Sequence, residues 1–367
     1  MTAAPATVVS QPPRRWGAEA GPVVIPDPDV LILDPAAAPL FVRNAIIERV
    51  WTGADWLEGP AWSAVGRFVV VSDTRADRQY RCLWETGGVS VFRAPSGHGN
   101  GNCFDAQGRL IVCEHFNRRV VRFGHDGRMR VLADRHEGRP LNSPNDAAVH
   151  PDGAVWFTDP AYGTTLAEGH PDEAGGPTNP DGRLDPQLGA EDAGLLGGSR
   201  RQPAGVYRCD PSDGRVDRVL GEDALPGPNG IAFSPDGRTL YLSSTEQAPG
   251  TPPPPAGDQA IHAFDVVDSR SLRNGRVLCG MVVDGAPCPP DGITVDVSGH
   301  LWCASSGALG HAGVVVLDPA GTPVARIRLP EVCSNTCFGG PRRNTLFMTA
   351  TRSLYRLDLN TQGAAPG

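Results

Sequence analysis

The sequence predicts an all-β protein, a six-bladed β-propeller of four-stranded antiparallel blades. Two observations support this prediction. A polar residue recurs eight positions before a glycine at five places in the chain, and neighbouring copies are spaced at about the length of a propeller blade. The five pairs are Glu58–Gly66, Asn100–Gly108, Asn145–Gly153, Asn229–Gly237 and Asp291–Gly299.

Each pair marks one β-hairpin. A short apolar alternation such as Ile231-Ala232-Phe233 lies before the glycine, and a second apolar run follows it, so the glycine supplies the tight turn between two strands. A sixth copy with a degenerate turn begins at Ser334. The second strands are predicted at Phe68–Val71, Leu110–Cys113, Val155–Thr158, Leu240–Ser243, Leu301–Ala304 and Leu346–Thr349.

The spacing of the copies gives the number of blades. The first three copies are separated by 42 and 45 residues and the last two by 43, whereas two other gaps are 84 and 62 residues long. Segments of about 163–203, rich in Gly, Pro and Asp, and about 248–258, with four consecutive prolines, explain the long gaps as insertions. We therefore expect one propeller at 45–360, both insertions on the face of the recurring polar residues, an N-terminal arm at 1–44 and a tail at 361–367.

An extra strand ahead of the first hairpin predicts how the ring closes. Ala45–Trp51 is apolar and extended in character, whereas the last repeat supplies only three strands, at 335–338, 346–349 and 354–359. Pairing 45–51 with 354–359 would complete the final blade and remove two exposed sheet edges.

Composition excludes several classes of protein. The net charge of −8 argues against a nucleic-acid partner, and no apolar run reaches membrane-spanning length. The N-terminus lacks the apolar core of a signal peptide, so a cytoplasmic location is expected. The nine cysteines are scattered without a C-x-x-C pair, and we interpret them as small core residues rather than disulfide or zinc ligands. The sequence leaves the oligomeric state open.

The first position of each repeat predicts a metal site. Because the inner strands of a propeller converge on the central axis, these positions should form one ring at one end of the channel. We call this set the oxygen ring, since every member has a side-chain oxygen and two are carboxylates. Its members are Glu58, Asn100, Asn145, Asn229, Asp291 and Ser334.

Turn formation is the alternative explanation for most of the ring. Asn-Gly and Asp-Gly pairs are common turn formers, and Pro228-Asn229-Gly230 could simply begin a strand. Glu58 favours the metal interpretation, because glutamate is not a turn residue and two carboxylates around one axis would repel each other without a cation. Hard oxygen donors suit Ca²⁺, with Mg²⁺ or Mn²⁺ as alternatives, and Zn²⁺ a weaker one because the ring lacks imidazole and thiolate.

The ends of the second strands should emerge beside the ring. Glu114 and His115 follow one strand, and Asp159 and Tyr162 follow the next. These side chains are candidates for substrate binding, as are Ser143 and the ring's own Asn100. His115 could instead be a rim or core histidine, and Asp159 could cap the turn before Pro160.

Several short motifs follow one another along about residues 45–360. They are Glu58-Gly59-Pro60-x-Trp62, Ile111-Val112-Cys113-Glu114-His115, Ser143-Pro144-Asn145-Asp146, Phe157-Thr158-Asp159-Pro160-x-Tyr162-Gly163, Pro228-Asn229-Gly230 and Pro290-Asp291-Gly292. Together they resemble the motifs of gluconolactonases, which belong to the senescence marker protein, gluconolactonase and luciferin-regenerating enzyme family of six-bladed calcium propellers.

The resemblance implies metal ligands at Glu58, Asn145, Asn229 and Asp291, and a proton-handling role for Asp291. It also implies hydrolysis of a sugar lactone, with the metal polarising the carbonyl while Asp291 assists water attack. Ser143 departs from the pattern, since some animal relatives place at this position an arginine that grips sugar hydroxyls.

Three alternatives stay open at this point. A calcium propeller could hydrolyse another ester, such as a phosphotriester or a different lactone. The chain could be a non-catalytic propeller that binds a ligand or protein. A propeller resembling strictosidine synthase would catalyse condensation without a metal, which the ring carboxylates argue against.

Overall fold

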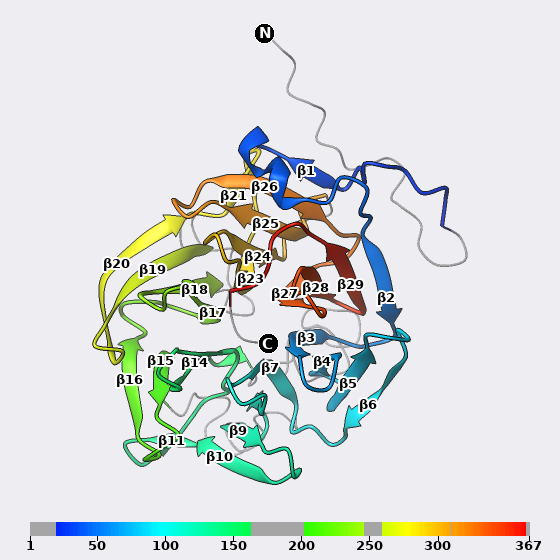
Figure 1. The fold of residues 1–367 in the computed structure, drawn as a ribbon. Coiled ribbons are helices and arrows are strands. Elements are labelled where there is room, and N and C mark those ends of the chain that lie inside the picture. Colours follow the sequence, from blue (N-terminus) through cyan, green and yellow to red (C-terminus); the bar gives the residue numbers. More distant parts are fainter. Residues whose placement is uncertain (1–19, 163–201, 246–258, 309, 365–367) are drawn as a thin grey trace, which may run out of the picture.

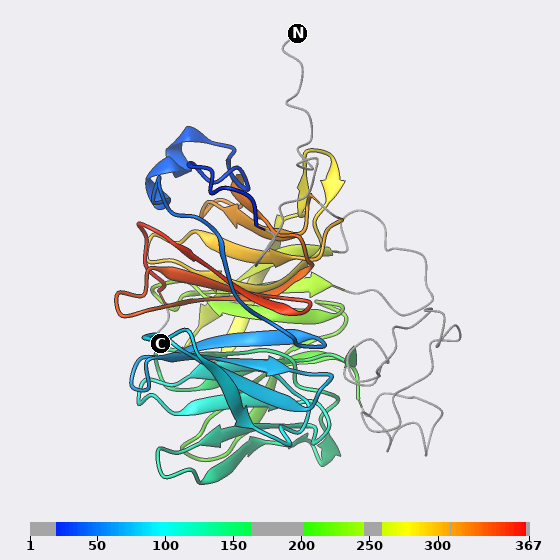
Figure 2. The same cartoon turned by 90° about the vertical axis from the view of Figure 1, so that its right-hand side faces the viewer.

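A computed structural model describes residues 20–162, 202–245, 259–308 and 310–364. Almost all of its regular structure is β, and six antiparallel sheets are arranged around a central axis (Figure 1). Seen from the side, the blades stand next to one another (Figure 2). The predicted six-bladed propeller is confirmed.

Each blade is built from strands that are consecutive in sequence, apart from the additions described below. The inner strands are β3 (Leu57–Ser63), β7 (Gly99–Phe104), β13 (Ala147–Val149), β17 (Pro228–Phe233), β23 (Pro290–Val295) and β27 (Cys333–Gly339). The second strands are β4 (Phe68–Asp73), β8 (Leu110–Glu114), β14 (Val155–Asp159), β18 (Thr239–Thr245), β24 (Leu301–Ser305) and β28 (Thr345–Ala350).

The outer halves of the blades complete the sheets. The third strands are β5 (Arg78–Leu83), β9 (Arg119–Phe123), β15 (Gly205–Cys209), β19 (Gln259–Val267), β25 (Gly313–Leu317) and β29 (Ser353–Asp358). The outermost strands are β6 (Val89–Arg93), β10 (Met129–Ala133), β16 (Val216–Gly221), β20 (Ser271–Cys279), β26 (Pro323–Arg328) and β2 (Glu48–Thr52). Two short hairpins connect blades: β11 (Arg135–His136) with β12 (Arg139–Pro140), and β21 (Val282–Val283) with β22 (Ala286–Pro287).

The ring closes as the sequence predicts. Strand β2 pairs antiparallel with β29, with Glu48 opposite Arg356 and Thr52 opposite Ser353. The strand begins at Glu48, three residues later than expected. A second addition was not predicted: β1 (Val30–Ile32) pairs with β26, so the fifth blade has five strands. The 3₁₀ helix η2 (Pro35–Leu40) follows, and its buried residues pack into the core between the fifth and sixth blades.

Four of the five hairpin glycines have the left-handed backbone that explains their recurrence. Gly108, Gly153, Gly237 and Gly299 have φ of 71°, 89°, 70° and 86°. The first blade differs, because Arg67 is its left-handed residue, with φ of 52°. Gly66 is needed for another reason: a Cβ there would collide with the ring of Phe68.

Apolar side chains fill the spaces between blades. Trp156 and Trp302 are fully buried in two of these interfaces. All nine cysteines are free thiols; six are buried and three half-buried, as expected for small core residues. Among the described residues, no helix is long and apolar enough to cross a membrane.

Candidate metal centre at one end of the channel

The six members of the oxygen ring lie at the same end of the inner strands. Ladder partners show this, since each inner strand begins opposite the end of its second strand: Glu58 faces Ser72, Gly99 faces Glu114, and Pro290 faces Ser305. We call this end of the channel the ring end and the opposite end the far end.

Hydrogen bonds join every blade to the next, and at five of the six seams the bond lies at or next to a ring position. At the seam between the fifth and sixth blades the bond lies further along the strands. Each of the six seams has one, and together they close a full circle. They run from Ser334 Oγ to the Leu57 carbonyl, Asn102 Nδ2 to the Gly59 carbonyl (2.6 Å), the Gly101 N–H to the Asn145 carbonyl (2.7 Å), Thr158 Oγ1 to the Asn229 carbonyl (2.7 Å), Ser243 Oγ to the Asp291 carbonyl (2.7 Å), and Thr336 Oγ1 to the Trp302 carbonyl (3.1 Å).

Glycines after the ring positions let the inner backbones approach this closely. A Cβ on Gly101 would lie 2.5 Å from the carbonyl oxygen of Asn145, which no side chain could accommodate. A Cβ on Gly59 or Gly230 would collide with the carbonyl of the next ring residue in the same way. The structure therefore brings the ring positions together around the axis, as the sequence predicts.

The polar atoms around the ring leave oxygens available for a cation. Asn229 donates from its side-chain Nδ2 to Thr245 Oγ1 at 3.1 Å, so its side-chain oxygen Oδ1 is not used in that contact. Asn100 is 2% exposed, and its Oδ1 has no hydrogen-bond partner among the described residues. A buried amide oxygen without a donor is costly unless something else coordinates it. The ring therefore fits a hard cation.

Two carboxylates contribute the negative charge of the ring. Glu58 is buried and accepts hydrogen bonds from Trp56 Nε1 (3.3 Å) and the Gly59 N–H (3.2 Å). Asp291 is half-buried, and it is the most accessible member of the ring. Burial raises the pKa of the Cys333 thiol, and the charges of Asp291 and Glu58 raise it further, so both carboxylates act on one thiol.

The donor set favours oxygen coordination. Within the described residues, no group of three or more His, Cys, Asp or Glu side chains could hold a metal ion. A cation at the ring would therefore depend on asparagine amide oxygens as well as the two carboxylates, which suits Ca²⁺ better than Zn²⁺.

A buried carboxyl group follows directly after one of the ring positions. Asp146 follows Asn145 and accepts hydrogen bonds from the Ala147 N–H at 2.9 Å and from Asn335 Nδ2 at 3.3 Å. Burial raises its pKa to about 6, against the effect of these bonds. Asp146 and Asn335 also border a cavity of about 180 Å³ that continues toward the far end.

The structure shows what the other candidate residues contact. Glu114 is fully buried and forms ion pairs with Arg93 and Arg119, both at 2.7 Å. His115 is 2% exposed, and its N–H donates to the His98 carbonyl. A role for either in substrate binding stays a prediction, and the contacts of Glu114 are those of an anchor for neighbouring side chains.

Hydrogen bonds of two candidate residues, Asp159 and Ser143, hold the loop that carries Asn145, and a third candidate, Tyr162, bonds to the next blade. Asp159 accepts the N–H groups of Asn142 and Ser143, both at 2.9 Å, and burial raises its pKa to about 7 despite these bonds. Ser143 Oγ donates to the Pro160 carbonyl at 2.8 Å. Tyr162 is half-buried, and its hydroxyl donates to the Gly227 carbonyl in the next blade at 2.9 Å. Their role in substrate binding is likewise still a prediction.

The two predicted insertions lie almost wholly outside the described residues. Their flanking residues are nevertheless at the ring end. Gln202 donates from its N–H to Asn142 Oδ1 at 3.2 Å, and Thr245, which precedes the second insertion, contacts Asn229. A position for both insertions on the metal face remains a proposal that these flanks support.

The sequence analysis missed two buried amides near the ring. Asn102 donates to the carbonyls of Gly59 and Asn100, and Gln79 bonds Asn102. A signal for Asn102 existed: two residues after the ring position the other repeats have Pro60, Ala147, Ile231, Ile293 and Thr336. Asn102 is the one amide at this position of the repeat, and this departure from the pattern is the sequence signal that marks it.

The fold and the oxygen ring define a six-bladed propeller with a candidate cation site at one end of its channel. The chain belongs to the SMP-30/gluconolactonase/LRE-like family, whose model matches residues 56–352. The resemblance seen in the sequence motifs is thereby confirmed.

Relatives of known name support this membership. The gluconolactonase of Zymomonas mobilis subsp. mobilis is 30% identical over 334 residues, which are 86% of this chain and 82% of that protein. The structure of a gluconolactonase from Xanthomonas campestris is similar with a TM-score of 0.72 and 34% identity, covering 92% of this chain and 97% of that one. Regucalcin from Agrobacterium tumefaciens, described as a calcium-binding protein, shares the fold with a TM-score of 0.62 and 17% identity, covering 86% of this chain and 94% of that one.

Proposed function

We propose that this chain is a metal-dependent hydrolase that opens a sugar lactone of the glucono-1,5-lactone type to the aldonic acid. Its class, a lactone hydrolase, follows from family membership and from the gluconolactonase relatives. The observation that carries the finer proposal is the oxygen ring, which gathers two carboxylates and several amides at one end of the channel.

Glu58, Asn145, Asn229 and Asp291 are the residues that we propose to hold one divalent cation, most simply Ca²⁺. Their oxygens come from four different blades. The hydrogen bonds across the seams between blades hold the backbone from which these side chains project. Asn100, with its buried Oδ1 lacking a partner among the described residues, is the next candidate for contact with the cation or substrate. Ser334 is less suited, because its hydroxyl donates to the Leu57 carbonyl.

The chemistry assigned to the chain is proton handling at Asp291. A bound divalent cation would polarise the lactone carbonyl and stabilise the oxyanion. Asp291 is the accessible carboxylate of the ring, whereas Glu58 is buried and accepts bonds from Trp56 and Gly59. We assign to Asp291 the orientation of the attacking water and the acceptance of its proton.

The substrate would enter from the ring end. Tyr162, Ser143 and Asp159 form the wall beside Asn145, and His115 and Glu114 lie at the end of the neighbouring blade's second strand. The far end is bordered by apolar side chains and by the C-terminal residues Gly363 and Ala364.

Proton release from a panel of sugar lactones tests the proposal. Chelator-treated protein is assayed with and without added Ca²⁺, and the spontaneous hydrolysis of each lactone is subtracted. We expect calcium-dependent hydrolysis of at least one six-carbon lactone. If no lactone is hydrolysed with Ca²⁺, Mg²⁺, Mn²⁺ or Zn²⁺, the proposal is wrong.

A further inference from the structure

A chain of polar side chains, three of them buried and one half-buried, connects the edge of the first two blades to the oxygen ring. Its members are Glu114, Arg93, Gln79 and Asn102, which we call the amide relay. They come from strands β8, β6, β5 and β7, so the relay crosses the seam between the blades that carry Glu58 and Asn100.

In the outer half of the relay, several contacts hold the guanidinium of Arg93 in place. Glu114 is fully buried and accepts Arg93 NH1 at 2.7 Å on one oxygen, and Arg119 Nε and Asn117 Nδ2 at 2.7 and 2.8 Å on the other. Arg93 also donates from NH2 to the Ser96 carbonyl at 2.6 Å and lies over the ring of Phe123 at 4.7 Å. With these contacts the guanidinium is fixed in place.

The inner half consists of two amides in series. Arg93 Nε donates to Gln79 Oε1 at 3.0 Å, and Gln79 Nε2 donates to Asn102 Oδ1 at 2.7 Å. Asn102 Nδ2 then donates to the carbonyls of Gly59 at 2.6 Å and Asn100 at 3.1 Å. Gln79 is fully buried and Asn102 is 6% exposed, so no bulk water competes for these bonds.

The direction of every bond in the relay follows from the arginine. A guanidinium can only donate, so Gln79 must present its oxygen to Arg93 and its NH₂ group to Asn102. Asn102 must then accept through its oxygen and turn its own NH₂ group toward the ring backbone. If either amide were reversed, two oxygens or two N–H groups would face each other in a buried place.

At its inner end the relay contacts the backbone at or next to the two ring positions of this seam, Glu58 and Asn100. Asn102 engages the main-chain oxygen of Asn100, whose side-chain Oδ1 has no hydrogen-bond partner among the described residues. It also engages the carbonyl of Gly59, whose own N–H donates to Glu58 Oε2 at 3.2 Å. At two other seams a single hydroxyl holds the carbonyl of the next ring residue, from Thr158 and from Ser243.

We propose that Gln79 and Arg93 are positioning residues for the metal centre, which set the orientation of Asn102 and through it the placement of Glu58 and Asn100. The inference rests on the proposed function, because it assumes that the ring holds a cation. It gives Glu114 a positioning role, as the anchor of Arg93, in place of direct contact with substrate.

Cation binding by Gln79→Glu and Gln79→Met tests the relay. The glutamate variant still accepts from Arg93 but cannot donate to Asn102, so Asn102 must reverse and lose its bonds to the ring backbone. The methionine variant removes the bonds to Arg93, Asn102 and Ser72 with little change in volume. We expect both to bind Ca²⁺ about tenfold more weakly, the usual scale for a lost partner behind a metal ligand. Calorimetry with Ca²⁺ alone gives the affinity, and Tb³⁺ luminescence excited through Trp56, which donates to Glu58 at 3.3 Å, gives a second measure.

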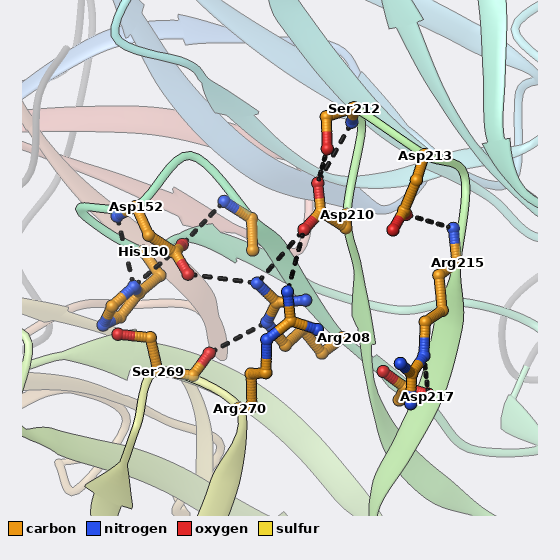
Figure 3. Close-up of polar contacts among 11 residues, drawn as sticks. His150, Asp152, Arg208, Asp210, Ser212, Asp213, Arg215, Asp217, Ser269 and Arg270 are labelled. Atoms are coloured by element: carbon orange, nitrogen blue, oxygen red, sulfur yellow. Dashed lines mark hydrogen bonds and ion pairs between the residues drawn. The ribbon is translucent and has the colours of Figure 1, made fainter.

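The matched control is a buried arginine network far from the ring. Arg208 is 2% exposed and bonds Asp152 Oδ2 at 3.0 Å and the Ser269 carbonyl at 2.9 Å, with Asp210 and Arg270 beside it (Figure 3). It joins the third blade to the fourth. Arg208→Met should lower thermal stability without changing the affinity for Ca²⁺.

The outcomes separate the relay from the proposed function. If both Gln79 variants are destabilised like Arg208→Met but bind Ca²⁺ within twofold of the parent chain, the relay is merely structural and the inference is wrong. If the parent binds Ca²⁺ and the Gln79 variants do so more weakly, but no lactone is hydrolysed, the relay stands and the proposed activity fails. A parent chain that binds no cation would overturn both.

Discussion

The two ends of the channel are made by the same six strands and have opposite chemistry. In strand β23, Asp291 lies at the ring end, and five residues later Asp296 follows the strand at the far end. Asp291 is half-buried in a ring of oxygens, whereas Asp296 is fully buried among donors. It accepts the N–H groups of Ser298 and His300, both at 2.9 Å, and Thr361 Oγ1 at 3.1 Å.

The comparison shows how a carboxylate's partners decide its role. Asp296 is satisfied by protein donors and holds the C-terminal segment, whose Gly363 and Ala364 border the far end of the cavity. The two ring carboxylates share the ring with further side-chain oxygens, an arrangement that a cation would stabilise. The fold supplies both positions, and at the far end the local donors give the carboxylate a structural role.

The largest effect on stability should come from the far end. Phe338 is buried there, edge-on to Trp302 with ring centroids 5.6 Å apart, and it borders the cavity. Phe338→Ala should lower the free energy of unfolding by about 3 kcal/mol, because the cavity enlarges. Denaturant titration measures this loss, and turnover below the unfolding transition should be unchanged. A folded variant with strongly reduced turnover would show that the far end takes part in catalysis.

Asp291→Asn should have the largest effect on turnover. The variant keeps an oxygen ligand but removes the proposed base and one charge, so kcat should fall by about 10² or more while weakened Ca²⁺ binding remains. Lactone hydrolysis at saturating Ca²⁺ measures it. Asp296→Asn is the matched control on the same strand, and it should lose stability but keep kcat. Full activity of Asp291→Asn with Ca²⁺ bound would make Asp291 a ligand only, and His115 or Asp159 would be the next candidate base.

Glu58→Gln should act on affinity more than on turnover. The amide preserves the shape and one oxygen but removes one of the two negative charges of the ring, so the Kd for Ca²⁺ should rise about tenfold or more. Calorimetric titration with Ca²⁺ gives the value. An unchanged Kd would mean that Glu58 serves only its bonds to Trp56 and Gly59.

The smallest effect concerns pH at the far end. The hydrogen bond to Asp296, with an Nδ1–Oδ2 distance of 3.2 Å, raises the pKa of His300 above its usual value near 6.5. The folded state then binds the proton more tightly, so the contribution is present below about pH 6.5 and is lost as pH rises through the raised pKa. His300→Gln should therefore cost about 1 kcal/mol or less at pH 5.5–6 and nothing at pH 9. Unfolding titrations across this range measure it, and a cost that does not fade with pH would contradict the assignment.

Much of the fold could be predicted from the sequence because its structural unit repeats. The eight-residue offset located five of the six hairpins, and the extra strand ahead of Glu58 gave the closure with β29. The oxygen ring followed, since one register places equivalent residues at one end of the channel. The pairing of β1 with the fifth blade escaped prediction, because a three-residue edge strand has no distinctive pattern.

The support of the site could not be predicted in the same way. Glu114 was readable as a residue near the ring, but its partner Arg93 lies on the outermost strand of the preceding blade. Gln79 is the second residue of β5, where nothing in the local pattern marks it as buried. Such contacts depend on how two blades pack, and that is fixed by side-chain volumes rather than by spacing along the chain.

Crystals grown with saturating Ca²⁺ would test the central claim most directly. We predict one calcium ion at the ring end, about 2.3–2.6 Å from oxygens of Glu58, Asn145, Asn229 and Asp291. An empty ring under these conditions, or a metal held by His115 instead, would contradict the claim.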